Sequence, residues 1–428
     1  MNYIILIYFE IKSIFFNNPF IIMSNPTTNY KVGGLDLSSI FQPLSLGSAS
    51  AITTNYSVTG YGDLNTIFAA YTSGTQASAT GYTVPGYGDL NTIFAKYDVP
   101  IVTNGTIYFG SWTYNSNTYT KIVAFIDTSN NGTIQLQNTT SCAVLIAGGG
   151  ASGGASNYGT GEGAGGGGAG TLIYGTISFA GNQTYNITVG KAGTQSTASS
   201  NTNNPGNAVA GGSGGNSSII GSGISETAFG GGRAGYSNGN GSTLTYITQY
   251  SGQNGGSGGG SMKPGNVSSS AGSSTTNQAA CSASTNTRSL TYAGNAGGKG
   301  AWNGSGGGGG GATSVGIDGS SNSIGSTTFS RGGIGYLFSV SGTTNSFINV
   351  YYCNGGSGGG GNTTQVPDFG TFISTYGGAG GGTSTTRTPA APTAYGSGGG
   401  GGWGAYQTAN SNNNGGLGKQ GIVLILVP

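Results

Sequence analysis

The stretch Cys142-Ala-Val-Leu-Ile-Ala147, followed at once by Gly148-Gly-Gly-Ala-Ser-Gly-Gly154, contains the two kinds of segment that make up most of this chain. The first part is a continuous apolar run of strand length, typical of a β-strand that is buried on both faces. The second part is a glycine run, and glycine loses more backbone entropy on ordering than any other residue. Such a run orders only where hydrogen bonds or close packing offset that loss.

A second apolar run, Gly421-Ile-Val-Leu-Ile-Leu-Val427, closes the glycine-rich region that the first run opens. We expect the two runs to lie in one core, as candidate partners in a sheet. Further strands are predicted beside them at 171–179, 184–189, 217–220 and 347–352. Upstream, residues 105–112, 118–126 and 132–137 alternate apolar and polar side chains between turn residues, which predicts a β-meander over 99–141. The predicted glycine-rich β domain then spans 142–428.

Glycine accounts for 91 of the 428 residues, about three times the usual share of ~7%. Its runs recur between the predicted strands, at 163–170, 211–215, 255–260, 306–311, 355–361, 377–382 and 398–402. Collagen is excluded because there is no Gly-X-Y period with abundant proline. Extended glycine segments of polyproline II type pack closely and exchange lateral hydrogen bonds, at ~3.1 Å of length per residue. The sequence therefore predicts a mainly β fold, with a β-sandwich-like core capped by glycine rods or tight glycine loops; flexible loops are the alternative.

Residues 23–98 contain three copies of one repeat. Its fullest form, Gly60-Tyr-Gly-Asp-Leu-Asn-Thr-Ile-Phe-Ala-Ala-Tyr71, returns at 86–97, and a shorter form occupies 33–41. An Asp followed by apolar residues at helical spacing predicts a short capped helix in each copy. Because so short a helix does not stand alone in water, its apolar face must pack on a neighbour, which favours oligomerisation or docking. The candidate caps are Asp36, Asp63 and Asp89, and the candidate packing residues are Ile40, Phe41, Ile67, Phe68, Ile93 and Phe94.

Residues 1–22 form an apolar extension of a different composition. Charged and polar residues, among them Glu10 and Lys12, interrupt it before it reaches the ~18 residues of a membrane helix. We expect this extension to be absent from the mature protein, with a hydrophobic anchor as the alternative. No membrane span is predicted.

The residues that usually carry chemistry are sparse. The chain has no histidine and only ten acidic residues, which removes Ser-His and Cys-His pairs and the commonest metal ligand. Cys142, Cys281 and Cys353 are far apart, so we predict reduced, buried thiols, or one bridged pair. The pattern Gly148 to Gly153 fits a dinucleotide fingerprint only formally, because glycine rather than a helix follows it. We predict no enzyme activity, cofactor or metal, and nucleic acid is not an expected partner because the net charge is +2 without a basic stripe.

Aromatic residues near the glycine runs are the candidate ligand contacts. Flat rings on a surface of low charge are suited to stacking on sugars, and Trp302, Trp403 and Tyr406 are the candidate ligand platform. The alternative is that these rings fill gaps between rods and strands.

The order of strands and glycines resembles that of a known family. Residues 144–150, 165–175, 181–190 and 418–425 are similar to the glycine-rich domain of tail-fibre and virion-surface proteins in bacteriophages and large DNA viruses. The Asp-Leu-x-x-Ile-Phe repeats look like those of giant-virus proteins. The resemblance implies a structural protein on the virion surface, like a fibre or spike, that forms homo-oligomers (trimers by analogy), contacts other virion proteins and attaches to a host, with host surface glycans as candidate partners. A secreted or extracellular glycan-binding adhesin and an ice-binding protein are the alternatives. The stretch 221–347 is longer than a minimal domain of this kind needs.

Overall fold

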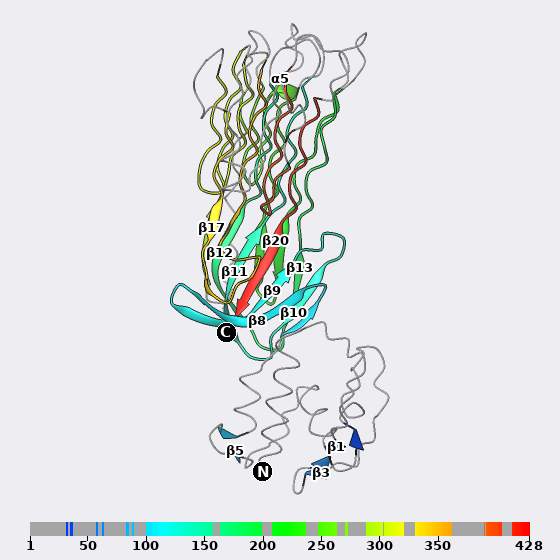
Figure 1. Ribbon diagram of the computed structural model, residues 1–428, viewed down its shortest axis with the longest axis vertical. Coiled ribbons are helices and arrows are strands. Elements are labelled where there is room, and N and C mark those ends of the chain that lie inside the picture. Colours follow the sequence, from blue (N-terminus) through cyan, green and yellow to red (C-terminus); the bar gives the residue numbers. More distant parts are fainter. Residues whose placement is uncertain are drawn as a thin grey trace. The chain divides into compact units, whose positions relative to one another are not determined.

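The structure is a computed structural model of the chain (Figure 1). The described residues are 31–32, 35–36, 57–58, 62–63, 83–84, 88–89, 100–156, 163–198, 208–236, 247–262, 270–272, 288–302, 304–320, 330–361, 389, 391–404 and 413–428. The chain divides into two compact units, Met1–Asp98 and Val99–Pro428. Each is described by itself.

Each repeat of the first unit contains one small antiparallel hairpin. Its second strand ends on the repeat's aspartate, so that Asp36 pairs with Lys31, Asp63 with Ser57 and Asp89 with Thr83. The hairpin strands are β1 (Lys31–Val32), β2 (Leu35–Asp36), β3 (Ser57–Val58), β4 (Gly62–Asp63), β5 (Thr83–Val84) and β6 (Gly88–Asp89). The helices predicted after each aspartate, with their Ile-Phe pairs, lie outside the described residues, as does the extension 1–22.

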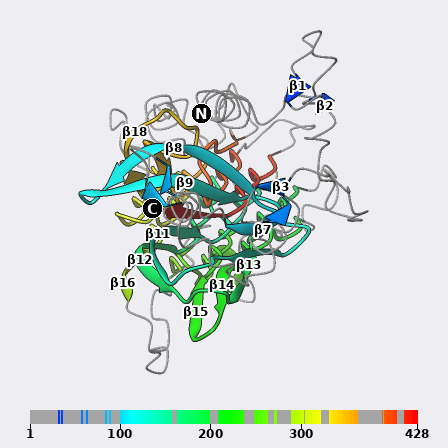
Figure 2. The same ribbon diagram turned by 90° about the horizontal axis from the view of Figure 1, so that it is seen from below.

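The second unit contains two large antiparallel sheets (Figure 2). One has five strands in the order β15-β14-β13-β10-β7, and the other has seven in the order β16-β12-β11-β20-β9-β8-β18. A small sheet pairs β17 with β19. The strands are β7 (Ile101–Thr103), β8 (Thr106–Tyr114), β9 (Asn117–Phe125), β10 (Gly132–Gln135), β11 (Thr140–Ala147), β12 (Leu172–Phe179), β13 (Thr184–Thr188), β14 (Ser217–Gly221), β15 (Ile224–Ala228), β16 (Arg288–Ala293), β17 (Tyr336–Phe338), β18 (Ser341–Gly342), β19 (Val350–Tyr352) and β20 (Ile422–Val427). The only helix among the described residues is α5 (Ile247–Tyr250).

The prediction of a mainly β chain is confirmed, and so is the expected pairing of the two apolar runs. β11 and β20 pair antiparallel at the centre of the seven-stranded sheet, with Leu145 opposite Leu424. Residues 99–141, predicted as one meander, are divided between the two sheets: β8 and β9 join the larger sheet, whereas β7 and β10 join the smaller. The burial of the two strands differs accordingly: β9 is buried along its second half, whereas β10 alternates between buried and half-buried residues.

The central strands of the seven-stranded sheet, β11 and β20, are buried on both faces. On one face Val144 and Ile146 pack with Ile134 and Tyr185 of the five-stranded sheet, which makes the pair of sheets a sandwich. On the other face Leu145 and its neighbours pack under a third layer drawn from residues 338–353. Two-sided burial is why β11 and β20 are apolar at every position rather than at alternate ones.

Beyond the sheets the glycine runs continue as extended segments, here called rods (Figure 1). The rod at 163–171 donates every backbone N–H to another rod, over 2.8–3.2 Å between nitrogen and oxygen. Gly163, Gly166 and Ala169 donate to a rod at 304–310; the next residue of each turn donates to a rod at 396–402, and the third to a rod at 229–235. A recurrence at every third residue is the periodicity of polyproline II, which has three residues per turn.

The carbonyl groups of this rod are also used. They accept hydrogen bonds from rods at 148–154, 257–260 and 356–359. The rod at 163–171 thus has six neighbours, three that accept from it and three that donate to it. Lateral hydrogen bonds of this kind supply the compensation that ordered glycine requires.

Candidate functional site

The rods give the second unit two distinct ends. At one end Thr171, Gly148 and Gly421 adjoin the strands β12, β11 and β20. At the other end, here called the distal end, Gly163 donates to Gly304 and Ala164 donates to Gly402, each over 3.0 Å. Because neighbouring rods are in register through such bonds, Gly163, Gly304 and Gly402 mark a common level far from the sheets.

Both tryptophans of the candidate platform lie at the distal end, on different rods. Trp302 is two residues before Gly304 and is 49% exposed. Trp403 directly follows Gly402, is half-buried, and donates its Nε1–H to the carbonyl oxygen of Gly361 over 3.0 Å. Tyr406 lies outside the described residues. Trp302 therefore has the exposed ring that a ligand contact needs, whereas Trp403 is held against a neighbouring rod.

A further feature of the rods escaped the sequence interpretation, at residues 233–236, where Gly235 accepts a hydrogen bond from Gly165. The Arg233 guanidinium lies over the ring of Tyr236, 5.4 Å from the ring centre. The two residues are three apart, so a rod of three residues per turn places them on the same side. The backbone N–H of Tyr236 donates to the carbonyl of Gln249 over 2.9 Å, which brings the short helix α5 beside them. From the sequence, the spacing of Arg233 and Tyr236 predicts a contact between them only if the segment is known to have three residues per turn.

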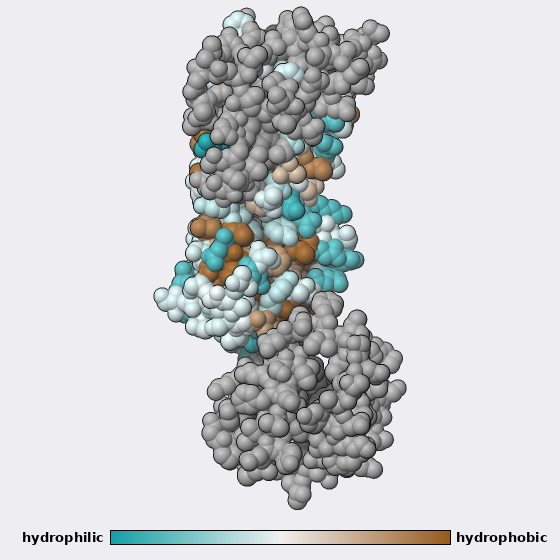
Figure 3. Space-filling view, viewed as in Figure 1, coloured by the Kyte–Doolittle hydropathy of each residue, from teal (hydrophilic) through white to brown (hydrophobic). Residues whose placement is uncertain are grey.

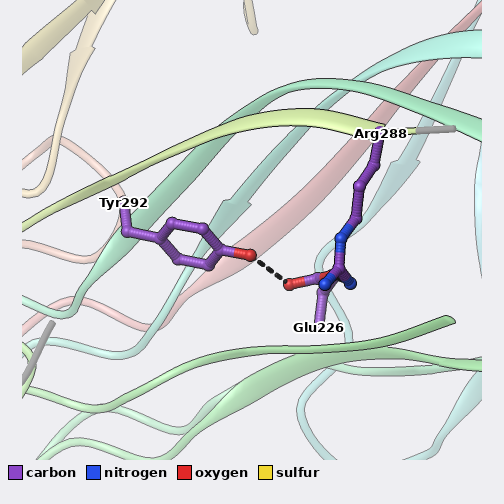
Figure 4. A network of polar contacts seen from close by, with 3 residues as sticks. All are labelled: Glu226, Arg288 and Tyr292. Atoms are coloured by element: carbon purple, nitrogen blue, oxygen red, sulfur yellow. Dashed lines mark hydrogen bonds and ion pairs between the residues drawn. The ribbon is translucent and has the colours of Figure 1, made fainter. Parts of the chain in front are cut away.

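A buried carboxylate closes one edge of the sandwich (Figure 4). Glu226 on β15 is fully buried, and it accepts hydrogen bonds from Arg288 and Tyr292 on β16, the Tyr292 bond over 2.8 Å. β15 and β16 are the edge strands of the two sheets. This network therefore joins the sheets, and both oxygens of the carboxylate are engaged in it.

The cysteine thiols and the acidic side chains of the described residues are the candidates for chemistry or metal binding. Burial raises the pKa of Cys142 and of Cys353 well above the ordinary range, so both stay protonated at neutral pH. Both are unbridged, while Cys281 lies outside the described residues. Across the described ranges no group of three or more His, Cys, Asp and Glu side chains is placed to hold a metal ion. Within the same ranges there is no helix with the length and apolar character to cross a membrane.

The visible face of the sheet region mixes apolar and polar residues without one dominant patch (Figure 3). Exposed large apolar side chains occur singly on several elements, including Val209, Val315, Leu337 and Leu417. Single exposed apolar residues are normal on a protein surface.

Fold and distal end together define a class of protein: a β-sandwich that carries a bundle of hydrogen-bonded glycine rods. The family model described as a glycine-rich domain matches residues 128–427, and the chain belongs to that family. A comparison with curated proteins finds no match.

Proposed function

We propose that this chain is a structural, non-enzymatic protein of the surface of a large DNA virus, displayed like a fibre or spike and used for host attachment. One observation carries the proposal: the second unit has a root and a tip. The chain enters and leaves this unit beside the sheets, while the rods extend away from them to the distal end.

The position of the root follows from strand pairing. Gly132, at one end of β10, pairs with Ile187, which comes just before the rod at 190–197. Gln135, at the other end of β10, therefore points away from the rods. Ile101 of β7 pairs with Gln135, so the chain enters this unit at the end away from the rods. Val427 is likewise the far end of β20, whose first residue follows the rod at 413–421. Residues 101 and 427 of this unit therefore both lie at the end of the sheets that points away from the rods.

Two of the sequences that connect rods have the composition of binding loops. Residues 199–207 and 405–412 each connect two rods along the chain; both are rich in Asn, Ser and Thr, and neither contains a charged residue. Such residues, with Tyr, supply adaptable hydrogen bonds in other recognition loops. Polar, uncharged connections carried on a rigid scaffold suit recognition of a surface.

The repeats of the first unit are proposed to assemble several copies or to dock them on other virion proteins, through the Ile-Phe pairs that follow each aspartate. Several copies would raise attachment strength by multivalency.

Mass spectrometry of purified virus particles tests the proposal, followed by antibody labelling of intact particles. We expect peptides from 99–428 in the particle and their accessibility to antibody on its surface. If the protein is absent from particles at stoichiometric levels, the proposal is wrong.

The second candidate is a secreted glycan-binding adhesin, and the exposed Trp302 at the distal end favours it. A glycan array with the intact protein, with Trp302→Ala and with Leu337→Ala as a control on β17, tests this function. We expect weaker sugar binding only with Trp302→Ala, by up to about tenfold, since ring stacking contributes about 0.5–1.5 kcal/mol. Equal binding by all three proteins would contradict it.

A further inference from the structure

Arg233 lies in the rod that begins at the end of β15, between Gly232 and Gly235, which accept hydrogen bonds from Gly168 and Gly165 of the rod at 163–171. One of its terminal nitrogens, Nη1, is buried and has no hydrogen-bond partner. The side-chain oxygen Oε1 of Gln249 is also buried and without a partner. Buried polar atoms are nearly always paired, so a donor and an acceptor left open in one neighbourhood require an explanation.

Backbone contacts fix this neighbourhood. The N–H of Tyr236 donates to the carbonyl of Gln249, and the N–H of Gln253 donates to the carbonyl of Arg233, each over 2.9 Å. The Tyr236 ring lies against the guanidinium and also packs with Ala155 and Ala208 of other rods. The ring holds the guanidinium by a cation–π contact, and the Nη1 donor is left for another group.

The described protein supplies no carboxylate to Arg233. Within the described part of the second unit, Glu226 is bound by Arg288 and Tyr292, Asp318 accepts from the N–H of Lys299, and Asp127 accepts from Ser129 and Asn130. Arg233 is partly exposed as a residue, but its Nη1 is buried without a partner. Burying a charged donor without a partner destabilises a protein, and such a cost is typical of binding sites.

We propose that Arg233, Gln249 and Tyr236 form a subsite for an acidic sugar. The planar guanidinium matches a carboxylate, and the Gln249 oxygen accepts from a hydroxyl or amide of the same ligand. This subsite rests on the attachment function proposed above and specifies its ligand class as a sugar that bears a carboxylate.

The test uses the full chain, with glucuronic acid and N-acetylneuraminic acid as probes, and with glucose and acetate for comparison. We expect both acidic sugars to raise the melting temperature and to bind by calorimetry more tightly than glucose or acetate. Arg233→Met should weaken this binding at least about tenfold, because a charge-assisted hydrogen bond is lost. Gln249→Met should weaken binding of the acidic sugars and leave binding of acetate unchanged.

Arg331→Met is the matched control, since Arg331 lies on another rod and is partly exposed. It should bind as the unchanged protein does. Without ligand, Arg233→Met should leave the melting temperature unchanged or raise it, because methionine keeps the apolar stem and removes an unpaired charge. A lower melting temperature would assign Arg233 a structural role and overturn the subsite.

Binding outcomes separate the subsite from the broader proposal. The subsite alone would be overturned if glucose or acetate bound as tightly as the acidic sugars. It would also be overturned if Arg233→Met bound the acidic sugars as tightly as the unchanged protein does. Absence of the protein from virus particles would overturn the attachment role and leave the binding data standing.

Discussion

Gly153 and Gly400 lie on neighbouring rods so close together that a Cβ atom on Gly153 would stand 1.9 Å from the carbonyl oxygen of Gly400. The same holds inside the central rod, where a Cβ on Gly167 would stand 2.4 Å from the carbonyl oxygen of Ala151. The atoms that an added Cβ would meet belong to the backbone of the neighbouring rod, so they cannot move aside as a side chain could. Glycine is therefore required by packing, in addition to its role in hydrogen bonding.

Gly153→Ala should lower the free energy of unfolding by about 1–3 kcal/mol, since the added methyl forces two rods apart. Gly416→Ala is the milder control, because a Cβ on Gly416 would stand 3.0 Å from its nearest neighbour, the backbone nitrogen of Gly400. Chemical denaturation of both variants provides the measurement. Equal stability of the two would show that the rods separate at no cost.

Amide protons of the central rod should exchange as slowly as those of β11. All N–H groups of 163–171 donate hydrogen bonds, and rods surround them. The N–H groups of Ala210 and Ser213, on an outer rod, donate none within the described residues and should exchange fast. Hydrogen exchange resolved by mass spectrometry or NMR checks this contrast. Fast exchange throughout 163–171 would mean that the glycines form a loose tether.

Arg288→Met should destabilise the sandwich by about 3 kcal/mol, because it removes the counter-charge of the buried Glu226 carboxylate and leaves the Tyr292 hydroxyl donating to it. The double variant Arg288→Met/Glu226→Leu should recover most of that loss, since replacing both charges by apolar groups removes the unpaired one. Thermal unfolding of the single and double variants is the measurement. If the losses simply add, the two residues do not act as a pair.

Stability should fall in alkaline solution. Burial raises the pKa of the Cys142 and Cys353 thiols, so the folded protein holds protons that the unfolded chain releases above about pH 8.5, the ordinary thiol value. The stabilisation is complete below that pH and is lost as pH rises toward the folded-state pKa values, by up to ~1.4 kcal/mol per pH unit for each thiol. Cys353→Ala should reduce this slope. The measurement is the free energy of unfolding of the unchanged protein from pH 7 to 11. A constant value over that range would contradict the predicted loss of stability.

The strands that can be predicted are those whose apolar character is local. The run at 142–147 and its partner at 422–427 need no context, because six consecutive apolar residues can only be buried. β15 and β16 were missed, since their isolated apolar residues, such as Ile224 and Leu290, are spaced among polar residues. Their burial depends on what faces them.

The candidate site divides in the same way. Aromatic type alone pointed to Trp302 and Trp403, and the structure places both at the distal end. Arg233 and Gln249 had no signal, because an unpaired buried atom is a property of its surroundings.

Composition and local pattern alone determined that this chain is mainly β and that its glycine must be either packed or flexible, because entropy and side-chain size act on each residue where it stands. Only the tertiary structure decided that the glycines form rods, which rod receives each hydrogen bond, and which end lies far from the sheets. Gly163 and Gly304 are far apart along the chain, and nothing in either residue selects the other. That choice depends on the simultaneous fit of six neighbours around the central rod.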